Sequence, residues 1–204
     1  MMTILKTVAI GAALLMLGAC SSTFEATSLD ASGRFPVSRV LPPEAITVSE
    51  AYPVDQSRKL LLVRTNLGTL TNYEEYFETS FENMRFFDTV MRTEEFERDL
   101  VRRGLAEEVG SVTGFAGLSK ASRALGQFLV VDIQLTADVG YQVAMTMTVY
   151  DPATATELFK VDHQVTNWAG LDGILFEPSF NAFIAWLEEN SPTFPENGRG
   201  DPSE

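Results

Sequence analysis

The sequence predicts an α/β (α+β) fold, in which helices pack on one mixed sheet within a single domain. Three observations predict this class. The first half of the chain alternates short apolar runs with amphipathic stretches, a pattern typical of strand–helix units. The second half contains three consecutive strand-like segments, and one more amphipathic stretch follows them. The expected order of elements is therefore βαβα(α)βββα.

The first expected unit is a buried strand followed by an amphipathic helix. Residues 59–64 form a nearly continuous apolar run, as in a strand that is buried on both faces. Large apolar side chains then recur at spacings of three and four residues, which is the period of a helix with one buried stripe. This stripe consists of Tyr73, Tyr76, Phe77, Phe81 and Met84.

The second expected unit begins with a strand over residues 86–91. Thr93 can cap the helix that follows, because its hydroxyl can accept a hydrogen bond from the first turn. Gly104 ends this helix, since glycine readily adopts the left-handed conformation found after a last turn. We expect its buried stripe to consist of Phe96, Leu100 and Val101.

A stretch with three spaced glycines, Gly110, Gly114 and Gly117, leads to an expected helix over residues 118–125, which Gly126 ends. The stretch lacks the Gly-Lys-Ser/Thr ending by which a phosphate-binding loop brings a lysine to its ligand. It also follows a helix rather than a strand. We therefore interpret it as a flexible loop.

The second half predicts antiparallel strands and a last helix. Residues 128–135 are mostly apolar and predict a central strand, whereas residues 141–149 alternate and predict one buried and one exposed face. A turn at residues 151–154 precedes a returning strand over residues 157–166. Pro178 suits the first turn of the last helix. The buried stripe of that helix consists of Phe180, Phe183, Ile184 and Leu187.

The N-terminus has the order of a secretory signal peptide: Lys6, an apolar run over residues 7–17, and small residues before Cys20. The run is about half the roughly 20 residues that a membrane-spanning helix needs, so we expect no permanent transmembrane anchor. An ordinary signal peptide with a chance cysteine is the alternative to the resemblance described next.

The residues directly before the cysteine, Leu17, Gly18 and Ala19, resemble the lipobox of bacterial lipoproteins. The resemblance implies that the Cys20 thiol receives a diacylglyceryl group, that the chain is cut before Cys20, and that the new amine is acylated, for example with palmitate. Such chains anchor a protein to a membrane without a basic patch. Serines at positions 21 and 22 fit export to the outer membrane, since aspartate there commonly signals inner-membrane retention in the systems that this chain resembles.

We divide the chain into a signal peptide (1–19), a lipidated N-terminus and tether (20–56), a periplasmic α/β domain (57–190) and a disordered tail (191–204). Small polar residues and prolines mark the tether, and prolines and glycines mark the tail. Residues 45–48 could form a short edge strand within the tether.

Charge and cysteine usage exclude several classes of function. The chain carries a net charge of -13, which argues against nucleic acid as a partner, and removal of Lys6 with the signal peptide increases that negative charge by one. Cys20 is the only cysteine, so no intramolecular disulfide can form.

We expect neither an enzyme nor a metal or cofactor site. The single histidine, His163, falls on the apolar side of the last strand between Val161 and Val165, where a sheet histidine without a catalytic role is the simpler interpretation. One histidine and one lipid-bearing thiol do not provide the ligand spacings of zinc sites, and no calcium-loop spacing occurs.

The arrangement of these segments resembles the periplasmic lipoprotein domains typified by the penicillin-binding-protein activator, the curli-secretion channel subunit and the N-terminal domain of the Tol-Pal β-propeller protein. The match covers about residues 59–189, and Ala155 stands where the turn of that group usually has glycine. The chain also has no further alternating strands that could build a membrane pore. The segments that carry the resemblance are 59–63, 86–90, the helix end at Gly104, 125–133, 145–152 and 157–160.

The resemblance implies a role in envelope assembly or regulation. Our leading hypothesis is a non-enzymatic lipoprotein of the outer membrane whose domain binds another envelope protein from the periplasmic side. The alternative is a domain that senses a small ligand or envelope stress, with a pocket near residues 110–117 that Phe115 lines. A hydrolase is a third and weaker hypothesis.

Two tryptophans are the candidate partner-binding residues. Trp186 lies about 100° from the centre of the buried stripe of the last helix, and Trp168 lies in an expected loop that no core periodicity includes. Exposed tryptophans are frequent at binding hot spots. The alternative is that Trp186 covers the edge of the core and Trp168 folds back over the sheet.

Overall fold

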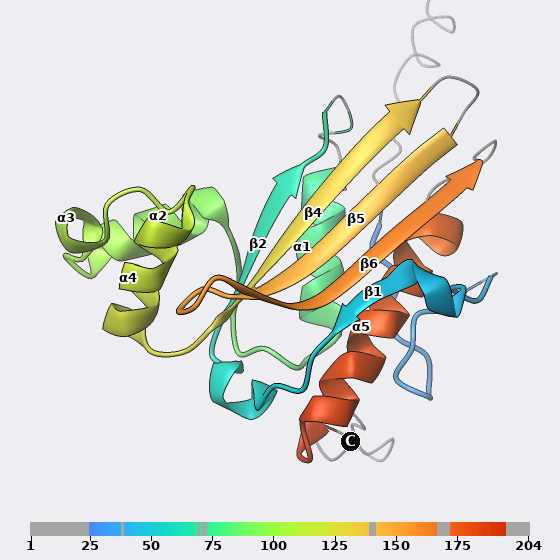
Figure 1. Ribbon diagram of the computed structural model, residues 1–204, viewed down its shortest axis with the longest axis horizontal. Helices are drawn as coiled ribbons and strands as arrows, with labels where there is room; N and C mark the ends of the chain where they lie inside the picture. Colours follow the sequence, from blue (N-terminus) through green and yellow to red (C-terminus); the bar gives the residue numbers. More distant parts are fainter. Residues whose placement is uncertain are drawn as a thin grey trace, which may run out of the picture.

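Six strands form one mixed sheet in the structure, a computed structural model that describes residues 25–37, 39–68, 70, 73–138, 142–166 and 172–194. The strands lie in the order β1-β6-β5-β4-β2-β3, with helices packed on the sheet (Figure 1). The predicted mixed α/β sheet in a single domain is confirmed. The strands are β1 (Ile46–Ser49), β2 (Leu61–Asn66), β3 (Val90–Arg92), β4 (Leu129–Asp138), β5 (Gln142–Asp151) and β6 (Thr156–Thr166). The α-helices are α1 (Glu74–Asn83), α2 (Thr93–Arg102), α3 (Ala106–Val109), α4 (Phe115–Leu125) and α5 (Glu177–Asn190).

β2 lies between two parallel neighbours, β3 and β4, as two successive strand–helix units require. Side chains of a strand alternate between its faces, so Leu61 and Val63 enter a core with α1 and α5, while Leu62 enters a second core with α2 and α4. Figure 1 shows α1 and α5 behind the sheet and α2 to α4 beside β2. The prediction of a strand buried on both faces is therefore confirmed.

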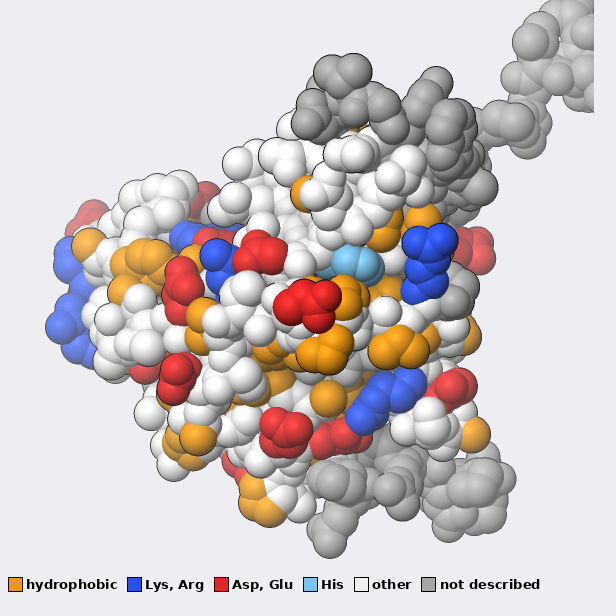
Figure 2. All heavy atoms as spheres, turned by 45° about the vertical axis from the view of Figure 1, so that its right-hand side comes forward, with side chains coloured by type: hydrophobic (Ala, Val, Ile, Leu, Met, Phe, Trp, Pro, Cys, Tyr) orange, Lys and Arg blue, Asp and Glu red, His pale blue; other side chains and the backbone are white. Residues whose placement is uncertain are grey.

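β4, β5 and β6 form the antiparallel meander. Four residues of β5, Val143, Met145, Met147 and Val149, alternate toward the core with α5, as their spacing predicts. On the opposite face Thr146 Oγ1 donates a hydrogen bond to Asp162 Oδ1 of β6 over 2.7 Å. At one end of this face α4 packs on the sheet, with 5.0 Å between the ring centroids of Phe115 and Tyr150. Figure 2 shows charged side chains interspersed with hydrophobic ones on the exposed surface.

The last helix follows its prediction closely. α5 contains Pro178 in its first turn, and its four stripe residues are fully buried. A five-residue π-helical turn, Asp172–Phe176, leads into it. No helix in the described ranges has the length and apolar character to cross a membrane.

The segment predicted as a tether packs on the domain. Phe35 is 1% exposed, and its N–H donates to Asn181 Oδ1 of α5 over 2.8 Å. Val54 is fully buried, and β1 pairs with β6 at the edge of the sheet. The expected edge strand near residues 45–48 is thus confirmed, whereas the expected start of the domain at residue 57 is wrong. Two apolar side chains of the segment, Phe35 and Val54, therefore belong to the same hydrophobic core as α5.

One strand boundary, one buried residue and one helix cap differ from their predictions, because contacts with distant segments outweigh the local spacing of apolar residues. The second strand is confined to β3, and Phe86 is buried in the loop before it. Val101, expected in a buried stripe, is 66% exposed. Arg92 rather than Thr93 precedes α2 as its N-cap.

The expected glycine-rich loop contains the start of α4, at Phe115. Gly117 packs its backbone on the preceding loop, since a Cβ there would lie 1.8 Å from the Ser111 carbonyl oxygen. Close packing, not flexibility, thus explains this glycine.

Candidate protein-interaction site

The structure buries one of the two predicted partner-binding tryptophans. Trp186 is 2% exposed, its Nε1–H donates to the Glu50 carbonyl over 3.0 Å, and its ring stacks on Phe183 at 5.9 Å between centroids. Its predicted place on the surface is therefore wrong. The reason is that the N-terminal segment, treated as a tether, covers that side of α5. Trp168 lies outside the described residues, as do the lipobox residues Leu17, Gly18 and Ala19 and the lipidation residue Cys20.

His163 lies on the predicted face of β6, opposite Met145 of β5, and is half-buried. Burial lowers the pKa of its imidazole, although a contact of 3.3 Å between Nδ1 and the Leu175 carbonyl oxygen acts in the other direction. The neutral ring is thus favoured at neutral pH. That His163 has no catalytic role stays a prediction.

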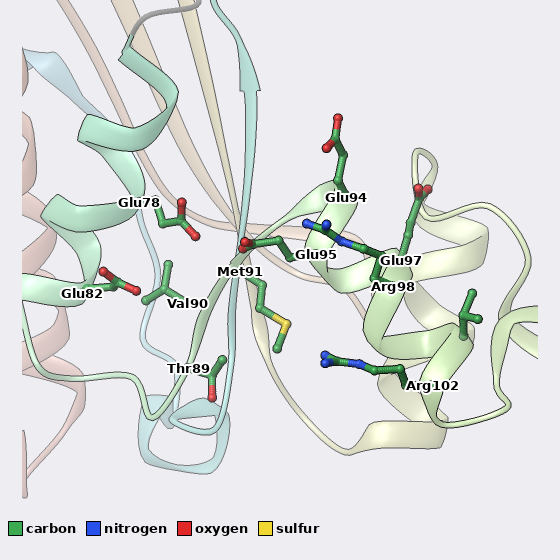
Figure 3. Close-up of a pocket in the computed structure, with 11 residues that line it drawn as sticks. Glu78, Glu82, Thr89, Val90, Met91, Glu94, Glu95, Glu97, Arg98 and Arg102 are labelled. Atoms are coloured by element: carbon green, nitrogen blue, oxygen red, sulfur yellow. The ribbon is translucent and has the colours of Figure 1, made fainter. Parts of the chain in front are cut away.

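A groove of about 1030 Å³ runs along β3. Figure 3 shows Glu78 and Glu82 of α1 on one side, Arg98 and Arg102 of α2 on the other, and strand residues between them. The lining residues are Glu78 and Glu82 from α1; Thr89 and the β3 residues Val90 and Met91; and Glu94, Glu95, Glu97, Arg98, Val101 and Arg102 from α2.

The floor of this groove is the free edge of the sheet, because β3 is the last strand and, among the described residues, pairs only with β2. The Leu61 N–H donates to the Thr89 carbonyl over 2.9 Å. Backbone groups of alternate residues point to opposite sides of a strand, so the N–H and C=O of Val90 point away from β2. Within the described residues neither group meets a hydrogen-bond partner on that side.

Two carboxyl groups meet at the upper end of the groove, Glu78 from α1 and Glu95 from α2. The guanidinium of Arg92 contacts both, with Nε 2.8 Å from Glu78 Oε2 and Nη2 3.8 Å from Glu95 Oε1. The Arg92 N–H donates to Glu95 Oε2 over 3.3 Å and thereby caps α2.

The two carboxyl groups differ in proton affinity. Burial and the hydrogen bond with Glu95 together raise the pKa of Glu78 to about 7, although the nearby Arg92 acts in the other direction. Burial also raises the pKa of Glu95, but the hydrogen bond from Glu78 and the contacts with Arg92 outweigh it, so the net shift is downward. Of the two carboxyl groups, Glu78 is therefore the one that holds a proton near neutral pH, and it donates a hydrogen bond to the ionised Glu95.

A second, smaller pocket of about 230 Å³ lies where β2 ends, beside the middle of β4. Arg64 and Asp132 line it and form a bidentate ion pair, while Arg64 Nη1 also donates to the Thr113 carbonyl over 3.0 Å. Thr113 belongs to the glycine-spaced stretch, so that stretch does border a pocket. Phe115 is not part of the lining: its ring lies 5.5 Å from the Arg64 guanidinium and 5.0 Å from the Tyr150 ring.

Sequence reasoning missed the groove. It assigned acidic pairs such as Glu94-Glu95 to solvated helix faces, and it took Val101 as a core residue. A detectable signal was a short strand between two helices that both carry glutamates, since a parallel βαβ unit brings such helices to the two sides of that strand. No group of three or more metal-ligating side chains occurs in the ranges that the structure describes.

Comparisons with known proteins found similar structures only. No family model and no curated protein matches the chain. The chain is similar to the LpoB C-terminal domain from Salmonella enterica, with 14% identity, a TM-score of 0.38, and coverage of 55% of this chain and 85% of that one. It is also similar to a lipoprotein from Neisseria meningitidis, with 14% identity, a TM-score of 0.39, and coverage of 62% and 96%.

A third similar structure is the PelC dodecamer from Paraburkholderia phytofirmans, with 13% identity, a TM-score of 0.37, and coverage of 70% of this chain and 92% of that one. Identities and TM-scores at this level leave the function of the chain to be argued from its own residues.

Proposed function

We propose that this chain is an outer-membrane-anchored periplasmic lipoprotein whose domain is a protein-interaction module in envelope assembly or regulation. The observation that carries the interaction role is the groove along the free edge of β3. It combines backbone groups that have no partner among the described residues, the exposed Val101 side chain and charged walls. Peptide-binding sites at sheet edges have these components.

The anchor rests on the residues before and at Cys20. Their resemblance to a lipobox implies lipid attachment at the thiol, and two or more acyl chains are sufficient for stable anchoring. Thr27 already contacts the domain, since Asn83 Nδ2 donates to its carbonyl oxygen over 3.3 Å. Seven residues span at most about 25 Å, so the domain would lie close to the membrane rather than at the end of a long tether.

Photo-crosslinking in intact cells tests the interaction role. A photoreactive amino acid at Val101, which is exposed in the groove, is compared with one at Glu107, which is exposed on α3 outside it. We expect Val101 to form a covalent adduct with one envelope protein and Glu107 to form none. Absence of adducts from Val101, or the same adducts from both positions, contradicts a groove-mediated interaction.

The small pocket at the carboxyl end of β2, beside the middle of β4, favours a second candidate, a small-ligand or stress-sensing domain. The carboxyl ends of parallel strands at a switch in strand order are a frequent place for ligands. The pocket is below the roughly 300 Å³ of typical ligand sites, and Asp132 already neutralises Arg64. A thermal shift by small metabolites that Asn66→Ala abolishes, with no effect of that variant on crosslinking, would favour sensing.

A further inference from the structure

We propose that the free edge of β3 binds an extended, lysine- or arginine-bearing segment of a protein partner as an additional strand of the sheet. This inference rests on the proposed function and specifies the chemistry of the partner. It draws on three independent features of the groove: its backbone, its charge and its apolar contacts.

The backbone provides the docking direction. The Val90 N–H and C=O point into the groove and lack partners within the described residues. An extended chain laid beside β3 would accept from this N–H and donate to this C=O, as a neighbouring strand does. The other outward N–H of β3, that of Arg92, is already taken by Glu95. The added strand would therefore pair with Val90, which can form two backbone hydrogen bonds with it.

Charge determines the kind of segment. Five glutamates and two arginines line the groove, and Arg92 contacts two of these glutamates, Glu78 and Glu95. The acidic excess therefore comes from the other three, which face one unpaired arginine, Arg98, among the described residues. Arg102 is already paired with Asp99, with 3.1 Å between Nη2 and Oδ1, whereas no ion pair occurs for Glu82, Glu94 or Glu97 among the described residues. Basic side chains on the bound segment would supply the missing partners, because opposite charges across an interface favour encounter and correct register.

Apolar contacts provide the remaining surface. Met91 is partly exposed beside the free edge, and Val101 of α2, which is 66% exposed, lines the same groove. Side chains of a strand alternate in direction, so a segment that alternates basic and apolar residues could place its apolar side chains against Val101 and its basic ones toward the walls.

A second copy of this chain is a poorer occupant. It would bring another -13 charge to a groove that is already rich in glutamates. Like charges placed together at an interface are unfavourable. We therefore assign the site to a different, basic partner.

Peptide titration of the full chain in detergent tests the assignment. The probe is a fluorescent, N-acetylated peptide of alternating lysine and valine, and its control is the matching glutamate–valine peptide. Glu82→Lys/Glu97→Lys reverses charge on both walls of the groove. Glu107→Lys/Glu108→Lys makes the same change in net charge on α3, outside the groove. Thermal melting of both variants verifies that they remain folded.

We expect the wild type to bind the lysine–valine peptide and not its control, and the groove variant to lose about tenfold in affinity or more. The α3 variant should change by less than about twofold. Bound peptide should slow hydrogen exchange of the Val90 amide without changing that of Met91, which faces β2. This last readout separates strand addition from attraction to an acidic surface.

Three results would overturn the inference: equal affinity losses in the two variants, an unchanged Val90 amide in the complex, or self-association of the free chain through this edge. Failure of the proposed function is distinguishable. If Val101 crosslinks an envelope protein while the peptide does not bind, only the strand-addition inference fails. If the peptide binds as expected while no crosslink forms in cells, the proposed function fails instead.

Discussion

Ala155 occupies a backbone position that favours glycine. It lies in the turn between β5 and β6 with φ of 59°, in the left-handed region. Asp151 organises this turn, since its carboxylate accepts from the Ala153 N–H and the Thr154 hydroxyl, each over 2.9 Å. The left-handed conformation costs a residue with a Cβ about 1–2 kcal/mol, and glycine does not bear that cost.

We predict that Ala155→Gly stabilises the domain by about 0.5–1 kcal/mol, because relief of the strain exceeds the added entropy of the unfolded chain. Urea unfolding measures the change. Ala153→Gly is the matched control: Ala153 is exposed in the same turn but has no positive φ, so its substitution should destabilise slightly. Destabilisation by Ala155→Gly would show that the strain is not realised in solution.

Glu78 predicts a pH dependence of stability. Its folded pKa of about 7 lies above its ordinary value of 4.5, so between these pH values the folded chain holds a proton that the unfolded chain has released. The contribution of Glu78 to the free energy of unfolding is therefore fully present below pH 4.5 and falls as the pH rises to about 7. The side chain is partly open to solvent, which limits the effect to about 1 kcal/mol.

The measurement is urea unfolding of Glu78→Gln and wild type at pH 5 and pH 8. We expect the variant to lose about 1 kcal/mol less stability than the wild type across this range. Glu107→Gln removes an exposed carboxyl on α3 that does not contribute to the pKa of Glu78, and it should follow the wild-type profile. Identical profiles for Glu78→Gln and wild type would contradict the raised pKa.

At the scale of elements, the segment before β1 is a structural part of the domain. Arg34 forms a bidentate ion pair with Glu188 of α5, and Phe35 packs on Phe180 with 5.5 Å between ring centroids. Asn181 closes the contact by accepting from the Phe35 N–H and donating to its carbonyl, over 2.8 and 2.9 Å. The segment thus fixes α5 from outside while the sheet contacts it from inside.

Phe35→Ala should accordingly destabilise the domain by about 3–5 kcal/mol, the usual range for removal of a buried aromatic ring. Val40→Ala, in the same segment but 89% exposed, should change stability by less than about 0.5 kcal/mol. Thermal or urea unfolding compares the two. An effect of Phe35→Ala as small as that of Val40→Ala would restore the interpretation of this segment as a tether.

Trp186 tests the same contact from the side of α5. Trp186→Phe keeps most of the ring packing against Phe159 and Phe183 but removes the hydrogen bond to the Glu50 carbonyl. We predict a loss of about 1–2 kcal/mol in unfolding free energy and no loss of partner crosslinking through Val101. Loss of crosslinking in a fully folded variant would restore Trp186 as a partner-binding residue.

At the scale of the whole molecule, we expect the location of the protein in the cell envelope to depend on Cys20. Cys20→Ser removes the thiol that the lipobox resemblance makes the acylation site, so we expect an unprocessed or soluble protein in cell fractionation. The domain should retain its melting temperature, because every core residue named above lies beyond residue 30. Normal processing and outer-membrane fractionation of the variant would contradict the lipoprotein proposal.

Local spacing was sufficient to predict most elements of this chain. The period of β5, the stripe of α5 and the two-sided burial of β2 follow from side-chain direction along strands and helices, which neighbouring residues determine. The place of His163 on the core face of β6 followed from the same alternation. The lipobox resemblance likewise depends on four consecutive residues.

Only the tertiary structure decided what each of these elements contacts. Trp186 is buried because a segment about 136 residues earlier in the chain covers it, and Val101 is exposed because no neighbouring element packs on that side of α2 in the described residues. The groove exists because parallel pairing of β2 and β3 brings α1 and α2 to the two sides of a free strand edge. Periodicity shows which side of an element is apolar, but which residues cover that side depends on contacts between distant parts of the chain.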